Sequence, residues 1–256
     1  MKNKFTILGC GSSLGSPWIN QNWGNCKKNN KRNIRTRCCA HIQYKDISIL
    51  IDTSPDIRHQ LIVNNIKQVD AILYTHEHAD QTAGIFEFRP IYFFKKKPIP
   101  IYCNKFTKNR LLKSYPWVFK SSKLYPQIMK IKETKNNFII RKNKNKINFK
   151  SLNVNHGPVD TRGYLFKKIA YISDCKSIPN KTLKMLKNLD VLIIDCFRKI
   201  SHSTHLDLES TLKIIKILKP KKGILINMHI DLDYDKLKKN LPKNIFPAYD
   251  GLNFKF

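Results

Sequence analysis

The sequence Tyr74-Thr75-His76-Glu77-His78-Ala79-Asp80-Gln81-Thr82-Ala83-Gly84 places two histidines two residues apart and a carboxylate two residues further on. The run that leads into it, Asp70–Tyr74, is short and apolar, which predicts a buried strand. The polar residues therefore follow a strand end, where the chain turns into a helix expected from about Thr82. Imidazole and carboxylate suit a borderline cation such as zinc, and a catalytic site keeps one coordination position open for water.

A polar turn with ordinary surface histidines is the alternative interpretation, and further candidate ligands at later strand ends weigh against it. His156 follows the strand-like run Leu152–Asn155 and precedes a Gly-Pro turn. Asp174 ends the apolar run that begins at Ile169, and His229 comes shortly after the last buried run. Each of these residues alone is more often structural. Together they predict a metal site assembled from several strand ends.

These motifs resemble the His-x-His-x-Asp-His signature of the metallo-β-lactamase-fold hydrolases. The resemblance implies that His76, His78 and His156 hold one metal, and that Asp80 and Asp174 hold a second with His229 as a further ligand. Gln81 stands where the family has histidine and offers only a neutral amide oxygen. Relatives place another metal histidine where this chain has Asn227. The second metal is therefore expected to bind weakly or to be absent.

The resemblance extends from Gly9-Cys10-Gly11-Ser12-Ser13 to Tyr249-Asp250-Gly251, nearly the whole chain. It is strongest to the branch of the phosphonate-pathway cyclic phosphodiesterase, the PhnP-like branch, with PqqB and tRNase Z as more distant relatives. It implies an α/β fold, a four-layer αββα sandwich. No boundary or repeat is visible, so we expect a single domain over residues 1–256.

The resemblance also implies an activity, metal-dependent hydrolysis of a small phosphodiester, cyclic ones included, by a metal-bound hydroxide. One or two zinc ions are expected, with manganese as an alternative. Asp80 or Asp174 would orient the water. In the family, a histidine near the start of the helix after Leu208 donates a proton to the leaving group. His205 is our choice for that role, and His202 is the second candidate.

The formal net charge of +30 is compatible with functions other than hydrolysis of a small phosphodiester. Such a charge suits a polyanion such as RNA, but the lysines are spread along the chain, which favours a compositional bias. The expected partner is a small anionic phosphodiester, and a homodimer is allowed. An RNA-processing endonuclease of the tRNase Z type, a non-catalytic PqqB-like binding protein, and a β-lactamase or thioesterase are the alternatives.

The cysteines and the hydropathy of the sequence indicate the cellular compartment in which the protein is expected. The seven cysteines include no C-x-x-C pair, which argues against a disulfide framework. No apolar run approaches the ~20 residues of a membrane span, so we expect no membrane partner. No signal-peptide core precedes the first predicted strand, Lys4–Leu8, and a cytoplasmic location is expected.

Several local features have two interpretations each. The glycine-rich turn Gly9–Gly15 is either a phosphate cradle or a plain tight turn. Asp52 is either a turn residue or a partner that orients a ligand histidine, and Arg89 binds either a substrate phosphate or a structural partner. The remaining predicted elements are a hairpin of Cys38–Tyr44 with Ile47–Ile51, a helix capped by Ser54 and reaching Asn64, a strand near Ile99–Cys103, a helix near Lys105–Lys113, and strands near Phe138–Arg141 and Ile147–Leu152.

Overall fold

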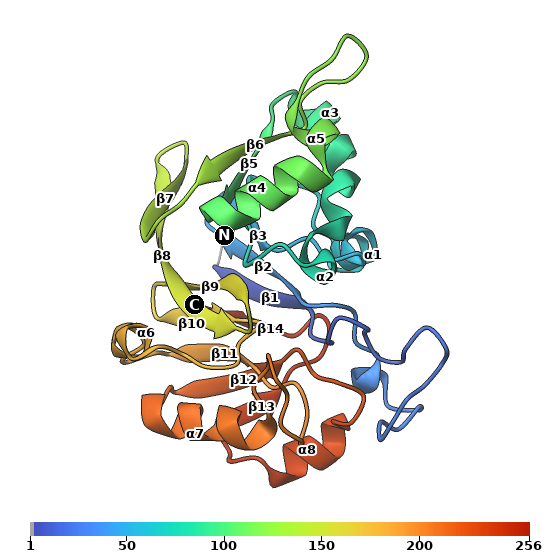
Figure 1. The fold of residues 1–256 in the computed structure, drawn as a ribbon, viewed down its shortest axis with the longest axis vertical. Helices are drawn as coiled ribbons and strands as arrows, with labels where there is room; N and C mark the ends of the chain where they lie inside the picture. Colours follow the sequence, from blue (N-terminus) through green and yellow to red (C-terminus); the bar gives the residue numbers. More distant parts are fainter. Residues whose placement is uncertain (1–2) are drawn as a thin grey trace.

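Two seven-stranded sheets form the centre of the computed structural model, which describes residues 3–256. Figure 1 shows the sheets between outer helices, which is the αββα sandwich predicted from the sequence. The first sheet has the order β14 (Asn253–Lys255), β1 (Lys4–Gly9), β2 (Cys39–Tyr44), β3 (Ile47–Ile51), β4 (Ala71–Leu73), β5 (Ile99–Cys103), β6 (Met129–Glu133). The second has the order β13 (Ile245–Pro247), β12 (Lys222–Ile226), β11 (Val191–Asp195), β10 (Ile169–Ile172), β9 (Val159–Phe166), β8 (Asn145–His156), β7 (Asn137–Lys142).

The helices divide between the two outer layers. Those that follow the strands of the first sheet are α1 (Ile57–Val63), α2 (Ala79–Thr82), α3 (Arg89–Lys95), α4 (Lys105–Ser114) and α5 (Pro116–Phe119). Those of the second half are α6 (Asn180–Met185), α7 (Leu208–Leu218) and α8 (Tyr234–Asn240). Short 3₁₀ turns occur at Lys31–Asn33 and Ala83–Phe88. Among the described residues, no helix combines the length and apolar character needed to cross a bilayer.

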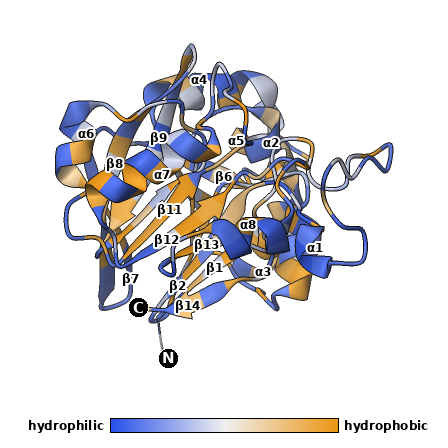
Figure 2. Ribbon diagram, turned by 90° about the horizontal axis from the view of Figure 1, so that it is seen from below, coloured by the Kyte–Doolittle hydropathy of each residue, from blue (hydrophilic) through white to orange (hydrophobic). Residues whose placement is uncertain are grey.

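Strand alternation explains how the layers are held together. In β3, Ile49 and Ile51 face the core between the sheets, whereas Leu50 faces the core beneath the first helical layer. Successive side chains of a strand point to opposite faces, so a strand with apolar residues at every position must be covered on both sides. Figure 2 shows the resulting pattern, with hydrophobic strands inside and helices that are hydrophilic on their outer surfaces. Burial of both faces supplies the main stabilising free energy of the fold.

Some helices and strands begin or end at residues other than those predicted. The helix predicted from Ser54 begins at Ile57, because the Ser54 hydroxyl donates to Gln60 and Asp56 pairs with Arg37 instead of capping. The helix expected from Thr82 begins three residues earlier, as α2. The two strand-like runs predicted near Ile147–Leu152 and Leu152–Asn155 form one strand, Asn145–His156, whose polar residues lie mostly on an exposed face. The edge strands β6, β13 and β14 are additional to the prediction.

The long loop between β1 and β2 is fixed against the second half of the molecule. Arg35 is buried and donates hydrogen bonds to the carbonyls of Leu232 and His229. A Cβ on Gly9 would meet the Arg37 carbonyl at 2.1 Å, so only glycine fits where the turn after β1 approaches the backbone. The turn is therefore tightly packed, and Ser13 within it reaches the cleft described below.

Candidate metal centre

The first candidate ligands lie in the turn between β4 and α2. Strands β3, β4 and β5 are parallel, so their carboxyl ends share one edge of the sheet. A hydrogen bond from the amide of Thr53 to the carbonyl of Gln81 holds the turn in place at 2.8 Å. His76 is fully buried and His78 is partly exposed at the start of α2. In the structure, both imidazoles therefore lie at a strand end, as predicted.

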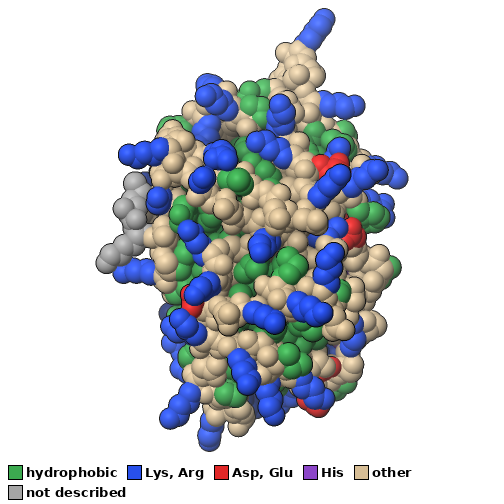
Figure 3. Space-filling view, turned by 90° about the vertical axis from the view of Figure 1, so that its left-hand side faces the viewer, with side chains coloured by type: hydrophobic (Ala, Val, Ile, Leu, Met, Phe, Trp, Pro, Cys, Tyr) green, Lys and Arg blue, Asp and Glu red, His purple; other side chains and the backbone are tan. Residues whose placement is uncertain are grey.

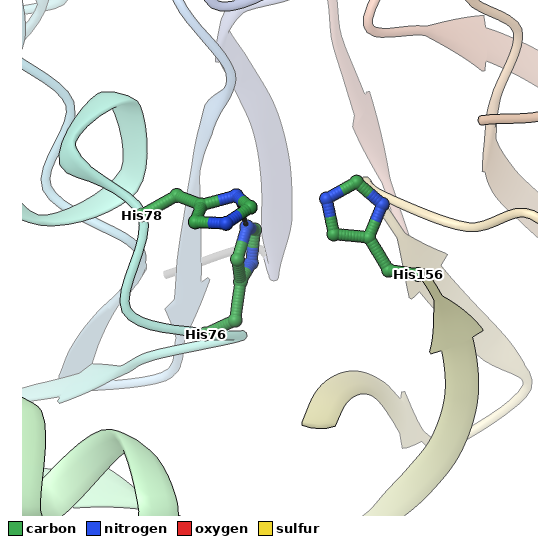
Figure 4. Close-up of side chains that lie close together, drawn as sticks. All are labelled: His76, His78 and His156. Atoms are coloured by element: carbon green, nitrogen blue, oxygen red, sulfur yellow. Dashed lines mark hydrogen bonds between the residues drawn. The ribbon is translucent and has the colours of Figure 1, made fainter. Parts of the chain in front are cut away.

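His156 reaches the same point from the second sheet, at the end of β8. Its ring centroid lies 5.2 Å from that of His76 and 5.3 Å from that of His78, and Figure 4 shows the three rings facing one another. Nε2 of His76 lies 3.0 Å from Nδ1 of His78. One nitrogen from each ring lies within 4.8 Å of the other two. We call these three residues the first cation position.

Hydrogen bonds behind the rings fix which nitrogens face inward. Nδ1 of His76 lies 3.0 Å from the Thr75 hydroxyl, which in turn lies 2.9 Å from Asp52. Nδ1 of His156 lies 2.8 Å from the carbonyl of Thr204 and must donate to it. Both Nε2 atoms are therefore left as lone-pair donors, the form that binds a metal. Asp52 thus contacts the centre through Thr75. This contact supports the interpretation of Asp52 as a residue that orients the ligand His76 over its interpretation as a turn residue.

Burial favours the neutral imidazoles that a cation requires. Burial lowers the pKa of His76 to about 3, despite the opposing charge of Asp174. The inward lone pairs of His76 and His156, with the imidazole of His78 beside them, fit zinc, which binds nitrogen ligands and in catalytic sites often takes three protein ligands. The donor set of the first cation position therefore fits the metal that the sequence implies.

A second group of side chains lies beside the first, and we call it the second cation position: Asp80, Gln81, Asp174 and Asn227. The Gln81 amide nitrogen lies 3.2 Å from Asp80 and 3.3 Å from Asp174. The Asn227 amide nitrogen lies 3.4 Å from Asp174. Burial, and then the charge of Asp174, raise the pKa of Asp80 to about 6. The structure thus brings together the two carboxylates that the sequence predicted, with the Gln81 amide between them and the Asn227 amide beside Asp174.

His205 faces the first cation position from the loop before α7. Its ring centroid lies 4.6 Å from that of His156, and its Nδ1 lies 2.8 Å from the fully buried Asp195. Burial opposes the charged ring, but the hydrogen bond and charge of Asp195 outweigh it and raise the pKa of His205. Burial raises the pKa of Asp195 as well, so the pair as a unit retains a proton near neutral pH.

The other predicted histidines lie around this group without joining it. His202 contacts the rings of Phe197 and His205, and burial lowers its pKa. His229 pairs with Asp231 at 3.0 Å and packs against Trp18 and Phe197. Among the described residues, two clusters have metal-ligand geometry, one of His76, His78 and His156 and one of His156, Asp174 and His205, and neither includes His229. The structure therefore does not bring His229 to the second cation position, because its ring turns toward Asp231.

The centre opens into a cleft of about 350 Å³. The cleft is lined by Ser13, His78, Asp80, His156, Pro158, Val159, Asp174, Thr204, His205 and Asn227. Arg89 is not among these residues, and its guanidinium lies 4.5 Å from the ring centroid of Tyr125. No cysteine lines the cleft, and all seven cysteines are buried.

Sequence reasoning left Asp195, Thr75 and Thr204 without a role at the centre. Asp195 ends the buried strand β11, the same pattern that marked Asp174, so its position was a usable signal. Thr75 is adjacent to His76, but its contact with Asp52 depends on the register of β3 and β4. The carbonyl of Thr204 carries no signal in the sequence, since every residue has one.

Comparison with known proteins identifies the family. A beta-lactamase superfamily domain matches residues 48–230. The chain belongs to the beta-lactamase superfamily. Within the superfamily, a crystal structure described as a new diphosphatase from the PhnP family is 32% identical, covers 100% of this chain and 98% of that one, and has a TM-score of 0.91. The resemblance to the PhnP-like branch is thereby confirmed.

Two further relatives of this superfamily member are more distant. Zinc-bound PqqB from Methylobacterium extorquens has a TM-score of 0.76 at 16% identity, over 99% of this chain and 100% of that one, which shows a shared fold. A curated protein from Porphyromonas gingivalis named octanoyltransferase is 28% identical over 253 residues, which cover 96% of this chain and 50% of that protein. The chain therefore spans about half the length of that relative.

Proposed function

We propose that this protein is a metal-dependent phosphodiesterase that hydrolyses a small phosphodiester, cyclic ones included. The observation that carries the proposal is a histidine–carboxylate pair beside a cation position: His205, paired with buried Asp195, lies 4.6 Å from His156 between ring centroids. The superfamily membership and the likeness to a PhnP-family diphosphatase support a phosphorus substrate. Zinc is the proposed cation and manganese the alternative.

Each residue has a defined task in this proposal. His76, His78 and His156 would hold a divalent cation, which supplies Lewis-acid stabilisation and lowers the pKa of a bound water. Asp80 accepts a hydrogen bond from the attacking water and orients it toward phosphorus. His205 donates the proton at Nε2 to the departing alkoxide, while Asp195 keeps Nδ1 protonated and the ring in position.

The positive surface charge supports an anionic substrate but does not identify which anion it is. The net charge is +30, and Figure 3 shows lysine and arginine side chains spread over one whole face, with few acidic side chains among them. Such a field attracts anions from solution and raises their local concentration. We propose that it aids capture of the phosphodiester and does not read a nucleic-acid sequence.

A thioesterase is the second candidate function, because of the relative named octanoyltransferase. An acyl thioester could be hydrolysed by the same centre, since a cation polarises a carbonyl oxygen as well as a phosphoryl oxygen. A thiolate leaving group needs no protonation, so an acid such as His205 would contribute little to that reaction. The pairing of His205 with Asp195 therefore favours the phosphodiester.

The test is a matched substrate panel. The zinc-loaded and manganese-loaded proteins are offered an alkyl phosphodiester, a 2′,3′-cyclic nucleotide, an octanoyl thioester and a precursor tRNA. Turnover of a small phosphodiester is expected, and its loss in a His76→Ala/His78→Ala variant would assign it to this centre. Turnover of the thioester alone would replace the proposal with the second candidate, and site-specific tRNA cleavage would replace it with an endonuclease.

A further inference from the structure

The amide of Asn227 is fixed by Asp174 of the second cation position and by Asp195, which lies outside that position. Its side chain is buried. Its Nδ2 lies 3.2 Å from His205 Nδ1, which donates its proton to Asp195, and it has two carboxylate acceptors, Asp195 Oδ1 at 3.2 Å and Asp174 Oδ1 at 3.4 Å. An amide nitrogen carries two hydrogens, which matches these two acceptors. If the amide were reversed, its oxygen would face the Asp195 carboxylate, and two acceptors would be opposed. The orientation with nitrogen inward is therefore set by Asp195, whether or not a cation is near.

This orientation removes Asn227 from the set of metal ligands. A cation at the second position would need a lone pair from this residue, and the inward group instead carries hydrogens with partial positive charge. Gln81 is less constrained, because its buried Oε1 has no hydrogen-bond partner and its amide can turn. The second position thus retains two carboxylates and at most one weak amide oxygen. Oxygen ligands of this kind suit a weakly held cation better than zinc.

We propose that the centre holds one cation tightly and that Asn227 is a positioning residue, tying Asp174 to the Asp195–His205 pair. The cation count rests on the amide geometry and on assigning His205, which lies within ligand distance of Asp174 and His156, to its pair with Asp195, whereas the effect of Asn227 on catalysis rests on the proposed function. Asp195 uses one oxygen for His205 Nδ1 and the other for Asn227, so its carboxylate cannot rotate. The amide of Cys175 also donates to the oxygen that bonds to His205, so removing the Asn227 amide releases only the other oxygen of Asp195 and loosens the ring of the proton donor in part.

The backbone at this position accepts the substitutions that a test requires. Asn227 has φ of 61°, in the left-handed region. Asparagine, aspartate and histidine are the non-glycine residues enriched there, so Asn227→His and Asn227→Asp add little backbone strain. A histidine at 227 and another at 81 would supply two imidazoles beside Asp80 and Asp174. The chain therefore offers a route to a second tight cation with few changes.

The first experiment counts cations. The wild type is loaded with zinc, dialysed against a mild chelator and weighed by native mass spectrometry. One retained zinc is expected for the wild type and two for the Gln81→His/Asn227→His variant, with at least a tenfold gain in affinity for the second ion. Two zinc ions retained by the wild type would overturn the proposal. If the double variant does not fold, the single Gln81→His variant and the wild-type count still decide it.

The second experiment tests the positioning role by comparing leaving groups. Asn227→Ala is expected to lose about tenfold in turnover of an alkyl phosphodiester and little with a nitrophenyl one, which needs no proton, while it keeps its cation. Asn145→Ala is the control, because Asn145 is a half-buried asparagine that bonds to Asp46. Equal losses on both substrates would refute positioning. A wild type with no phosphodiesterase activity would refute the proposed function and leave the cation count standing.

Discussion

The two cation positions lie side by side, yet their side chains are oriented in opposite ways. At the first position, the outer nitrogens of His76 and His156 are bonded to Thr75 and Thr204, which leaves lone pairs inward. At the second position, the amides of Gln81 and Asn227 direct hydrogens inward, toward Asp80 and Asp174. The hydrogen-bond partners of each side chain therefore decide whether it offers a cation a lone pair or a hydrogen.

The largest expected effect comes from removing ligands of the first position. The His76→Ala/His78→Ala variant should lose its cation and all measurable turnover, because one imidazole cannot hold zinc alone. The fold should survive, since the core lies mostly between and behind the sheets. Elemental analysis and circular dichroism check both statements. Full metal occupancy in the variant would show that the cation is held elsewhere.

The hydrogen bonds behind the first position can be tested without touching a ligand. Thr75→Val removes the hydroxyl between His76 and Asp52, and Thr75→Ser retains it. Loss of such a partner typically weakens metal binding by about 10–100-fold. Competitive titration with a chromophoric chelator should therefore separate the two variants. Equal affinities would mean that packing alone orients the His76 ring.

His41 is a buried histidine outside the metal centre, so its pKa reports the effect of burial without that of a metal. Burial lowers the pKa of His41 to about 4, and its Nε2 is bonded to Ser48. The folded protein binds fewer protons here than the unfolded chain, so this contribution is present above pH ~6.5 and is lost as pH falls through about 4, by about 3 kcal/mol. Chemical denaturation of the wild type and His41→Gln across that range should reveal it. Parallel pH profiles for the two proteins would contradict the assignment.

The smallest specific effect is expected for RNA. Because the positive charge is distributed and not confined to the centre, any RNA affinity should fall linearly with salt on logarithmic axes and should ignore sequence. Fluorescence anisotropy with two unrelated oligonucleotides measures both. A strong preference for one sequence at physiological salt would give the charge a function beyond attraction of anions.

How far the sequence predicts this molecule depends on the range of the interaction. Apolar runs located the buried strands, and the spacing of His76, His78 and Asp80 located the centre. The edge strand β6 was missed although Met129 and Ile131 alternate with lysines as in a half-buried strand, because the run is only five residues long. The pairing of Asp195 with His205 and the inward amide of Asn227 depend on side-chain orientation, which no local pattern encodes. His229 lies two residues after the motif position held by Asn227 and was predicted as a further ligand, but its contact with Asp231 turns it away.

The most direct test of the central claim is the leaving-group dependence of the His205→Ala variant, with cation content measured in the same samples. A positioned general acid typically contributes about 10²–10⁴-fold. We expect that loss for an alkyl phosphodiester, a much smaller loss for a nitrophenyl one, an unchanged cation content, and little effect of His202→Ala. Equal losses on both substrates, or equal losses in both variants, would contradict the role of His205 as proton donor.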